Sequence, residues 1–301
     1  MIYTVTFNPA IDYVAQLGGS LQLGGLNRNC GEAVHFGGKG INVSVVLNAL
    51  GVDNVALGFI AGFTGEGLEK GLMTAGVKTD LIRVAQGLTR INVKIKAQQE
   101  TEINGIGPTI TGEDMQKLYK QLDRLGSNDY LVLSGSIPGC LGNDTYEGIL
   151  DRLTGRGISV VVDAAGDLLR NVLKYRPFLV KPNHHELAEL FGEQLQSREQ
   201  IVCLAEKLQQ QGARNVLVSM AENGALLLDE TGSVHEIGCP EGTVVNSVGA
   251  GDSMVAGFLA GYLKTGDYDH ALRLGTAAGS ATAFSMGLAN KQMIMKLLDR
   301  L

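Results

Sequence analysis

The stretch Asn246-Ser247-Val248-Gly249-Ala250-Gly251-Asp252-Ser253 predicts a tight turn that leads from an apolar run, residues 243–245, into a helical run, residues 254–263. Glycines let the backbone approach a ligand closely, and the first free N–H groups of a helix bind anions. An aspartate beside such a site can take a proton from an alcohol during phosphoryl transfer. Taken alone, the stretch fits equally well a helix that Asp252 merely caps.

The composition indicates an α/β protein with a large core. The chain has 301 residues, 45% of them hydrophobic, with 41 glycines and only 6 prolines. This length allows one large domain, alone or with an appendage. The formal charge of −6 and the absence of any Lys/Arg run argue against nucleic acid as a partner.

The sequence predicts neither a membrane span nor a secretory signal. No window approaches 18 uninterrupted apolar residues, and the N-terminus enters an alternating strand pattern at residues 2–7 without a basic segment. The scattered cysteines form no CxxC pair, so we expect reduced thiols and a cytoplasmic location. They are Cys30, Cys140, Cys203 and Cys239.

Strand and helix patterns alternate along most of the chain. Strands are expected at residues 2–7, 55–60, 130–133, 158–162, 178–180 and 216–218, and helices at 41–50, 66–75, 113–125, 146–153, 201–210 and through most of 252–301. Residues 10–30 are Gly-rich and suggest irregular or short-stranded structure. The alternation predicts a mainly parallel sheet covered on both faces, with ligands at the carboxyl ends of its strands. Polar residues follow these strands: Asn8, Ser134, Ser136, Asp163, Lys181, Asn183, Ser219 and Ser247.

The segment from Phe36 to Asn42, FGGKGIN, places glycines and Lys39 before a helix. It is not a Walker nucleotide loop, because the order of its residues is wrong and no Ser or Thr follows Lys39. Two interpretations remain open. A Gly-Gly turn can admit sugar hydroxyls that Asn42 would bind, or the glycines can simply allow tight packing.

The segment Asn183-His184-His185-Glu186 is a candidate Mg²⁺ site. Residues three apart share one face of a helix, so Asn183 and Glu186 can present oxygens to the same point. Magnesium prefers such oxygen ligands together with water and substrate phosphates. His184 and His185 are not expected to be ligands, since adjacent residues on a helix diverge.

A basic group consists of Arg28, Arg90, Lys94 and Lys96. Residues 90–94 alternate as in a strand, which places Arg90, Asn92 and Lys94 on one face. Such a face can bind a phosphate that the substrate already carries. A solvated strand face is the alternative.

Four boxes occur in a fixed order: TVTFNPAID at residues 4–12, GGKGINV at 37–43, KPNxxE at 181–186 and GAGDS at 249–253. Together they resemble the PfkB (ribokinase-like) carbohydrate kinase family over nearly the whole chain. Within that family, residues 24–28, 89–94, 101–105 and 181–187 resemble the subgroup that phosphorylates fructose 1-phosphate.

The resemblance implies a three-layer α/β/α sandwich with a mainly parallel central sheet, formed as a single domain over residues 1–301. A small β-sheet lid is expected from segments near 10–30 and 88–105, and lids of this family often pair in homodimers. The implied reaction uses ATP and Mg²⁺ to phosphorylate fructose 1-phosphate at its 6-hydroxyl, giving fructose 1,6-bisphosphate and ADP.

The resemblance also implies roles for individual residues. Asp252 would be the general base, and a free aspartate, with a pKa of about 3.9, would be ionised at neutral pH. The N–H groups of Gly249, Ala250 and Gly251 would form an anion hole, and Asn183 and Glu186 would bind Mg²⁺. The sugar would be bound by Asp12, Gly37, Gly38, Lys39 and Asn42, and its phosphate by Arg28, Arg90 and Ser136. The implied nucleotide-binding residues are Lys181, Asn183, Ser219, Ala221, Gly224, Ser247 and Val248. Lys94 as a phosphate ligand is an extrapolation from strand geometry.

Three other functions remain open at this stage. The first is a kinase of another sugar phosphate, chiefly tagatose 6-phosphate. The second is a kinase of an unphosphorylated sugar or nucleoside. The third is a sugar-phosphate sensor without catalytic activity. The oligomeric state, effectors and any monovalent-cation requirement are not predicted by the sequence.

Overall fold

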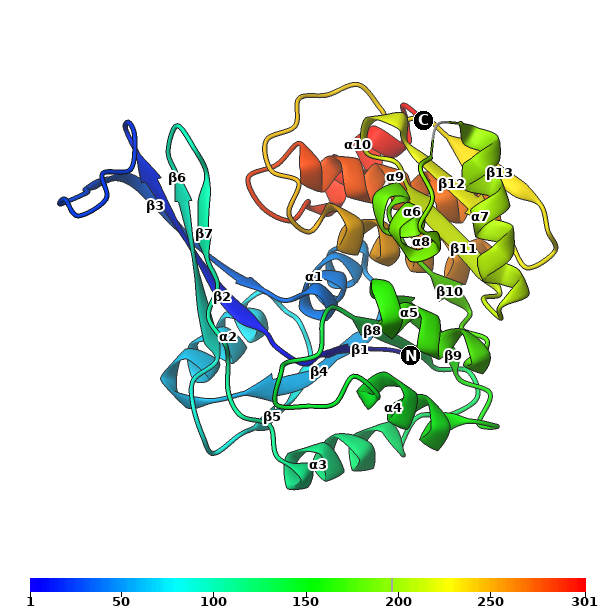
Figure 1. Cartoon of the computed structure of the whole chain (residues 1–301), viewed down its shortest axis with the longest axis horizontal. Coiled ribbons are helices and arrows are strands. Elements are labelled where there is room, and N and C mark those ends of the chain that lie inside the picture. The colour runs from blue at the N-terminus through cyan, green and yellow to red at the C-terminus, as the bar shows by residue number, and fades with distance from the viewer. Residues whose placement is uncertain (196) are drawn as a thin grey trace.

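A large sheet runs through the middle of the molecule in the computed structural model, which describes residues 1–195 and 197–301 (Figure 1). The strand order is β13-β12-β11-β10-β9-β8-β1-β4-β5. All neighbours from β11 to β5 run parallel, whereas β12 and β13 are antiparallel additions at one edge. The bounds are β1 Ile2–Thr6, β4 Asn54–Ile60, β5 Thr79–Arg83, β8 Tyr130–Ser134, β9 Ser159–Asp163, β10 Leu179–Val180, β11 Asn215–Ser219, β12 Ala225–Leu228 and β13 Val234–Ile237.

Helices cover both faces of this sheet, as predicted. On one face lie α3 Gly112–Leu122, α4 Thr145–Leu153, α5 Gly166–Val172, α6 His184–Phe191 and α7 Arg198–Gln210. On the other lie α1 Lys39–Leu50, α8 Ala250–Thr265, α9 Tyr268–Ala283 and α10 Lys291–Leu298, with α2 Gly62–Thr74 packed beside α1. Short 3₁₀ turns occur at Leu173–Tyr175 and Ala221–Asn223.

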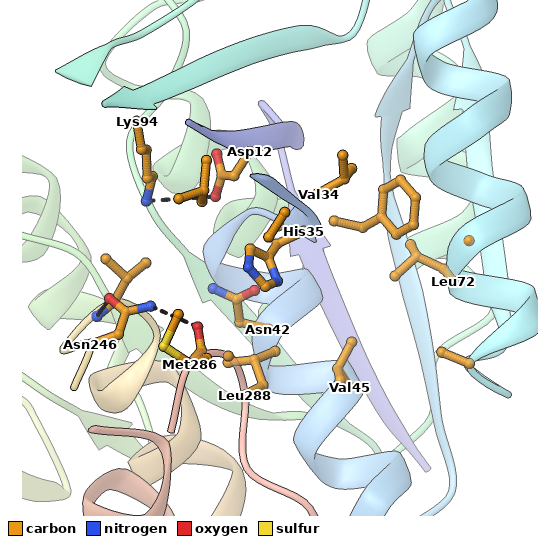
Figure 2. Close-up of a pocket in the computed structure, with 18 of the residues that line it drawn as sticks. Asp12, Val34, His35, Asn42, Val45, Leu72, Lys94, Asn246, Met286 and Leu288 are labelled. Atoms are coloured by element: carbon orange, nitrogen blue, oxygen red, sulfur yellow. Dashed lines mark hydrogen bonds and ion pairs between the residues drawn. The ribbon is translucent and has the colours of Figure 1, made fainter. Parts of the chain in front are cut away.

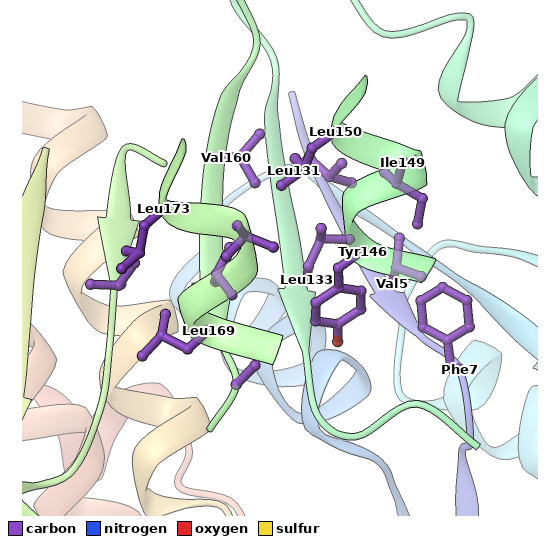
Figure 3. Packing of buried hydrophobic residues seen from close by; sticks show 14 of the residues in the cluster. Val5, Phe7, Leu131, Leu133, Tyr146, Ile149, Leu150, Val160, Leu169 and Leu173 are labelled. Carbon is purple, nitrogen blue, oxygen red and sulfur yellow. The ribbon is translucent and has the colours of Figure 1, made fainter. Parts of the chain in front are cut away.

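The two cores follow from the two-residue period of the strands. Leu131 and Leu133 point to the α3–α7 side, where they pack with Phe7 and Tyr146 (Figure 3), whereas Val132 points to the α1 and α8 side. Burying one such side chain contributes about 1.5–3 kcal/mol, so both layers hold the sheet firmly. The strand ends that carry the polar residues are thereby fixed in position.

A second, four-stranded sheet stands away from the large one (Figure 1) and has the order β3-β2-β6-β7. Its strands are β2 Ala10–Leu17, β3 Asn29–Gly37, β6 Arg90–Lys96 and β7 Thr101–Ile103. We call it the lid sheet. The expectation of irregular or short-stranded structure across residues 10–30 was wrong for β2, which has eight residues, because the glycines cluster in the β2–β3 connection.

The start of α1 is held directly against β1. A Cβ atom on Gly40 would lie 2.6 Å from Thr6 Oγ1 and 2.7 Å from the carbonyl oxygen of Val5. The N–H of Ile41 also donates to Thr6 Oγ1 at 2.9 Å. Glycine at position 40 is therefore required by close packing of the helix end on the strand.

Candidate active site

The carboxyl ends of the parallel strands open into a cavity of about 440 Å³, which we call the central cavity. Most of the residues predicted to bind sugar, phosphate and metal line it, although their segments are far apart in the chain. From the predicted set these are Asp12, Gly38, Lys39, Asn42, Arg90, Lys94, Lys181, Asn183, Glu186, Ser219, Val248, Gly249, Gly251 and Asp252. The fold therefore brings predicted residues from distant segments of the chain into one cavity.

Asp252 lies in the first turn of α8 and is 5% exposed. Gly249, in the left-handed region with φ of 81°, is the N-cap of this helix, and no side chain caps it. The alternative that Asp252 caps the helix is therefore wrong. Its Oδ2 instead accepts a 2.7 Å hydrogen bond from Nδ2 of Asn42. Of the first N–H groups of α8, that of Ala250 donates to the carbonyl oxygen of Ser247 at 3.2 Å.

The expectation that Asp252 is ionised at neutral pH without special tuning was wrong. Burial, and after it the negative charge of Asp163, raise its pKa to about 7. The hydrogen bond from Asn42 and the charges of Lys39 and Lys181 act in the opposite direction. A pKa close to neutrality is the value at which a carboxylate works best as a general base.

Asp163, at the end of β9, forms the centre of a buried charge cluster. Its Oδ1 lies 3.4 Å from Nζ of Lys39 and 3.3 Å from Nζ of Lys181, and its Oδ2 has no partner. Burial would raise the pKa of Asp163, but the two ammonium groups hold it below its ordinary value. The sequence placed Asp163 among the polar residues at the ends of the predicted strands, and it does line the central cavity, but no role was assigned to it.

Asn183 and Glu186 lie together, but not for the predicted reason. Helix α6 begins at His184, so Asn183 is its N-cap rather than a residue on its face. Glu186 N–H donates to Asn183 Oδ1 and Asn183 N–H donates to Glu186 Oε2, both at 2.8 Å, as in a capping box. Both residues still line the central cavity.

The lid sheet contributes a polar row to the central cavity. Arg90, Asn92 and Lys94 all line it, so the prediction that they share one face of a strand is confirmed. Asn92 Nδ2 donates to Asp12 Oδ1 at 2.7 Å, and Lys94 Nζ lies 3.7 Å from Asp12 Oδ2. Burial lowers the pKa of Arg90, and its Nε donates to the carbonyl oxygen of Asn8 at 3.1 Å.

Three of the residues predicted to bind the sugar or its phosphate lie outside the central cavity. Arg28 is exposed near the end of the β2–β3 connection, and Ser136 is exposed in the loop after β8. Neither lines a described cavity. Gly37 lines an adjoining cavity of about 290 Å³ between the lid sheet and α1, which we call the lid cavity.

Figure 2 shows the lid cavity from close by. Asp12 and Lys94 of the lid sheet lie across it from Met286 and Leu288 of the body. Asp12, Asn42 and Lys94 line both this cavity and the central one, so a movement of the lid sheet would change the two together.

A third space of about 690 Å³, the helix cavity, lies beside the first turn of α8. The predicted nucleotide residues Asn183, Ser219, Ala221, Gly224 and Ser247 line it, as does Ala250. His184 and His185, whose ring centroids are 3.9 Å apart, lie at the same wall. Sequence reasoning missed its other wall, formed mainly by α9 and the loop after β13.

The central and helix cavities share Asn183, Ser219 and Gly251 in their linings. They therefore meet at the N-terminus of α8, beside the buried carboxylate of Asp252. Two adjoining binding spaces, a helix N-terminus that attracts phosphate and a base between them define a phosphoryl-transfer enzyme.

Comparison with known proteins agrees with this class. Residues 6–294 match the pfkB family carbohydrate kinase model, and the chain belongs to that family. It is 47% identical over 298 residues to a 1-phosphofructokinase of Bacillus subtilis (strain 168), covering 99% of this chain and 97% of that protein. It is 36% identical to a D-tagatose-1-phosphate kinase of Bacillus licheniformis, covering 96% and 95%.

The fold is also shared with solved structures. Phosphofructokinase-2 from Escherichia coli in complex with fructose-6-phosphate superposes with a TM-score of 0.92 at 26% identity, covering 100% of this chain and 98% of that one. A tetrameric inhibited form of the same protein gives a TM-score of 0.91 at 27% identity, covering 99% and 98%. The expected ribokinase-like architecture is thus confirmed, and the chain is an ATP-dependent sugar-phosphate kinase.

Proposed function

We propose that this kinase transfers the γ-phosphoryl group of ATP to the 6-hydroxyl of fructose 1-phosphate, giving fructose 1,6-bisphosphate and ADP. The junction of the central and helix cavities beside Asp252 carries this proposal, since a donor in the helix cavity and an acceptor in the central cavity would meet there. The 47% identical relative is a 1-phosphofructokinase, which supports the choice of sugar phosphate.

Asp252 would take the proton of the 6-hydroxyl as the new P–O bond forms and the bond to the β-phosphate oxygen breaks, with ADP leaving. The N–H groups of Gly249 and Gly251 would stabilise charge on the transferring group, and that of Ala250 would do so in exchange for its 3.2 Å hydrogen bond to the carbonyl oxygen of Ser247. Lys181 lies near this point, because a Cβ atom on Gly251 would be 3.1 Å from its Nζ. Lys39 and Lys181 would add positive charge on the side of Asp163.

The lid sheet and α1 would hold the sugar phosphate. Asp12, Gly38 and Asn42 would bind sugar hydroxyls, and Arg90 would bind the 1-phosphate. Lys94 would have to exchange its contacts with Asp12 and Glu102 for the phosphate. Roles for Arg28 and Ser136 would require a movement of their loops or a second subunit.

Magnesium fits the oxygen atoms of the central cavity. No group of three or more His, Cys, Asp or Glu side chains suited to a metal occurs within residues 1–195 and 197–301. A Mg²⁺ ion that is held mostly by phosphates and water needs only one or two protein ligands, and Asn183 and Glu186 would supply them. The ion would neutralise charge on the donor phosphates.

D-Tagatose 1-phosphate is a second candidate substrate, because a 36% identical relative acts on it according to its name. A coupled ADP-release assay over fructose 1-phosphate, tagatose 1-phosphate, tagatose 6-phosphate, fructose 6-phosphate and free fructose separates the possibilities. We expect the highest kcat/KM with fructose 1-phosphate. A higher value with any other sugar would refute the assignment, and no ADP release at all would favour a sensor.

We further propose a cytoplasmic homodimer that pairs through the lid sheets. Exposed apolar side chains lie on the segments of the lid, among them Leu23 at 91%, Val34 at 53% and Ile103 at 59%. No helix in the described part of the chain is both long and apolar enough to cross a membrane. Sedimentation should show a dimer that Val34→Glu with Ile103→Glu converts to a monomer.

A further inference from the structure

Tyr146 is a buried tyrosine whose hydroxyl binds the loop at the carboxyl end of β8. It belongs to α4 and is 1% exposed, and its ring packs in the core at a centroid distance of 5.9 Å from that of Phe7 (Figure 3). Its hydroxyl donates a 2.9 Å hydrogen bond to the carbonyl oxygen of Gly135. Burial, and after it the charge of Asp163, raise the pKa of Tyr146, so the hydroxyl stays protonated and remains a donor.

Gly135 is held from two sides. Its φ of 97° lies in the left-handed region, which favours glycine. Its N–H donates to the carbonyl oxygen of Asp163 at 3.0 Å, while its own carbonyl oxygen accepts from Tyr146. Asp163 is itself fixed, because β9 pairs with β8 on one side and with β10 on the other. The hydroxyl of Tyr146 therefore completes an anchor that ties this loop to the sheet.

The stem of Lys39 runs alongside Gly135. A Cβ atom placed on Gly135 would lie 3.7 Å from Cβ and 3.9 Å from Cδ of Lys39. The side chain of Lys39 is 43% exposed, yet its Nζ lies 3.4 Å from Oδ1 of the buried Asp163. An exposed lysine has many conformations open to it, and contact with a fixed backbone reduces their number. Gly135 thus helps to hold Lys39 in the orientation in which it lines the central cavity.

The position of Lys39 matters for the buried carboxylate of Asp252. The positive charge of Lys39 lowers the pKa of Asp252, against the effects of burial and of Asp163. The same charge would stabilise the transferring phosphoryl group in the proposed reaction. If Lys39 moved away, more of the base would be protonated and the phosphoryl group would be less stabilised.

We propose that Tyr146 is a positioning residue whose hydroxyl holds Gly135 against the stem of Lys39. The ammonium group of Lys39 is thereby kept beside Asp163, where its charge acts on Asp252. The inference rests on the proposed roles of Lys39 and Asp252. Tyr146 acts from the core on the α3–α7 side of the sheet, whereas Lys39 belongs to α1 on the other side, so Tyr146 would not touch the substrate itself.

The test compares Tyr146→Phe, which keeps the ring and removes the hydroxyl, with Tyr175→Phe as a matched control. The hydroxyl of Tyr175 donates to Oδ1 of Asp151 at 2.7 Å, and Tyr175 packs against the same core. It precedes β10, at the opposite edge of the sheet from the loop after β8. In Tyr146→Phe we expect kcat/KM to fall roughly 3- to 10-fold, the usual loss for one hydrogen bond. Tyr175→Phe should keep the parent value.

The pKa of Asp252 gives a readout that a merely structural role would not move. Carboxyl-carbon NMR of isotope-labelled aspartates measures it in the protein without substrate, and the signal of Asp252 is identified by its loss in Asp252→Asn. In Tyr146→Phe the pKa of Asp252 should rise above the parent value of about 7, because Lys39 is held less firmly. In Tyr175→Phe it should not change.

The variant Lys39→Met shows whether Tyr146 acts through Lys39, since methionine keeps an unbranched stem without the charge. In the Lys39→Met background, Tyr146→Phe should leave the pKa of Asp252 unchanged. A parent-like pKa of Asp252 in Tyr146→Phe, or a shift just as large in the Lys39→Met background, would overturn the proposal. The titration needs no turnover, so these outcomes do not depend on which sugar is phosphorylated. Near-normal turnover of Asp252→Asn would instead refute the base and leave the positioning of Lys39 intact.

Discussion

Asn42 and Asp252 are 210 positions apart, yet Asn42 Nδ2 donates a 2.7 Å hydrogen bond to Asp252 Oδ2. This contact joins the start of α1 to the start of α8 at the floor of the central cavity. Asn42 thus connects the proposed sugar site with the proposed base, and its hydrogen bond lowers the pKa of Asp252 against the effect of burial.

The first prediction concerns Asn42→Ala. Without its hydrogen bond, the pKa of Asp252 should rise further and less of the base should be ionised at pH 7. Sugar-phosphate affinity should fall as well, so we expect kcat/KM to drop about 10²-fold, within the range for loss of a positioned base. Asn48→Ala is a matched control on the same helix, because Asn48 Nδ2 donates to the carbonyl oxygen of Ala75 away from the site. Equal losses in both variants would contradict a specific role.

Much of this arrangement was predictable from the sequence. The GGKGIN and GAGD boxes placed Asn42 and Asp252 at helix starts, and the strand pattern of residues 90–94 put Arg90 and Lys94 on one face. These predictions succeeded because they depend on local spacing alone.

What failed depends on contacts between distant segments. The pKa of Asp252 is raised mainly by burial and by Asp163, which is 89 positions away and was expected at the strand ends but given no role. Thr276 and the loop after β13 belong to the helix cavity only because α9 packs against α8.

The second prediction concerns pH. The base must be deprotonated, so kcat/KM should fall about tenfold per pH unit below the Asp252 pKa of about 7. Substrate phosphates also titrate near pH 6, so the pH profile of the wild-type enzyme alone does not show which group causes the loss of activity at low pH. The variant Asp163→Asn lacks the charge that raises the pKa of Asp252, so the fall of kcat/KM should move to lower pH. If the fall stays at the same pH, a substrate group is responsible.

The third prediction concerns Asp252→Asn, which should remove most turnover, by about 10²- to 10⁴-fold, while ATP binding stays near the parent value. Near-normal turnover would rule out Asp252 as the base. The amide can still accept the hydrogen bond from Asn42, so the local geometry should persist.

The same variant has a consequence for stability. Because the folded pKa of Asp252 lies above its unfolded value, its contribution to stability is fully present below about pH 3.9 and is lost as pH rises through about 7. Asp252→Asn should therefore unfold at a higher temperature than the parent at pH 8, and the difference should disappear toward pH 4. The gain at pH 8 is on the order of a few kcal/mol, at about 1.4 kcal/mol per pKa unit. Thermal unfolding at both pH values measures it, and a variant less stable than the parent at pH 8 would contradict the raised pKa.

The last prediction concerns the lid sheet. The lid cavity lies between Asp12 and Lys94 on one side and Met286 and Leu288 on the other, which leaves room for the lid to close over a bound sugar phosphate (Figure 2). Closure would exclude water and limit hydrolysis of ATP. Amide hydrogen exchange in residues 88–105 should therefore slow when fructose 1-phosphate binds. Peptides from α3, which packs on the opposite face of the large sheet from α1, should not change and serve as an internal control. Equal exchange in residues 88–105 with and without sugar phosphate would mean that the lid does not close on this substrate.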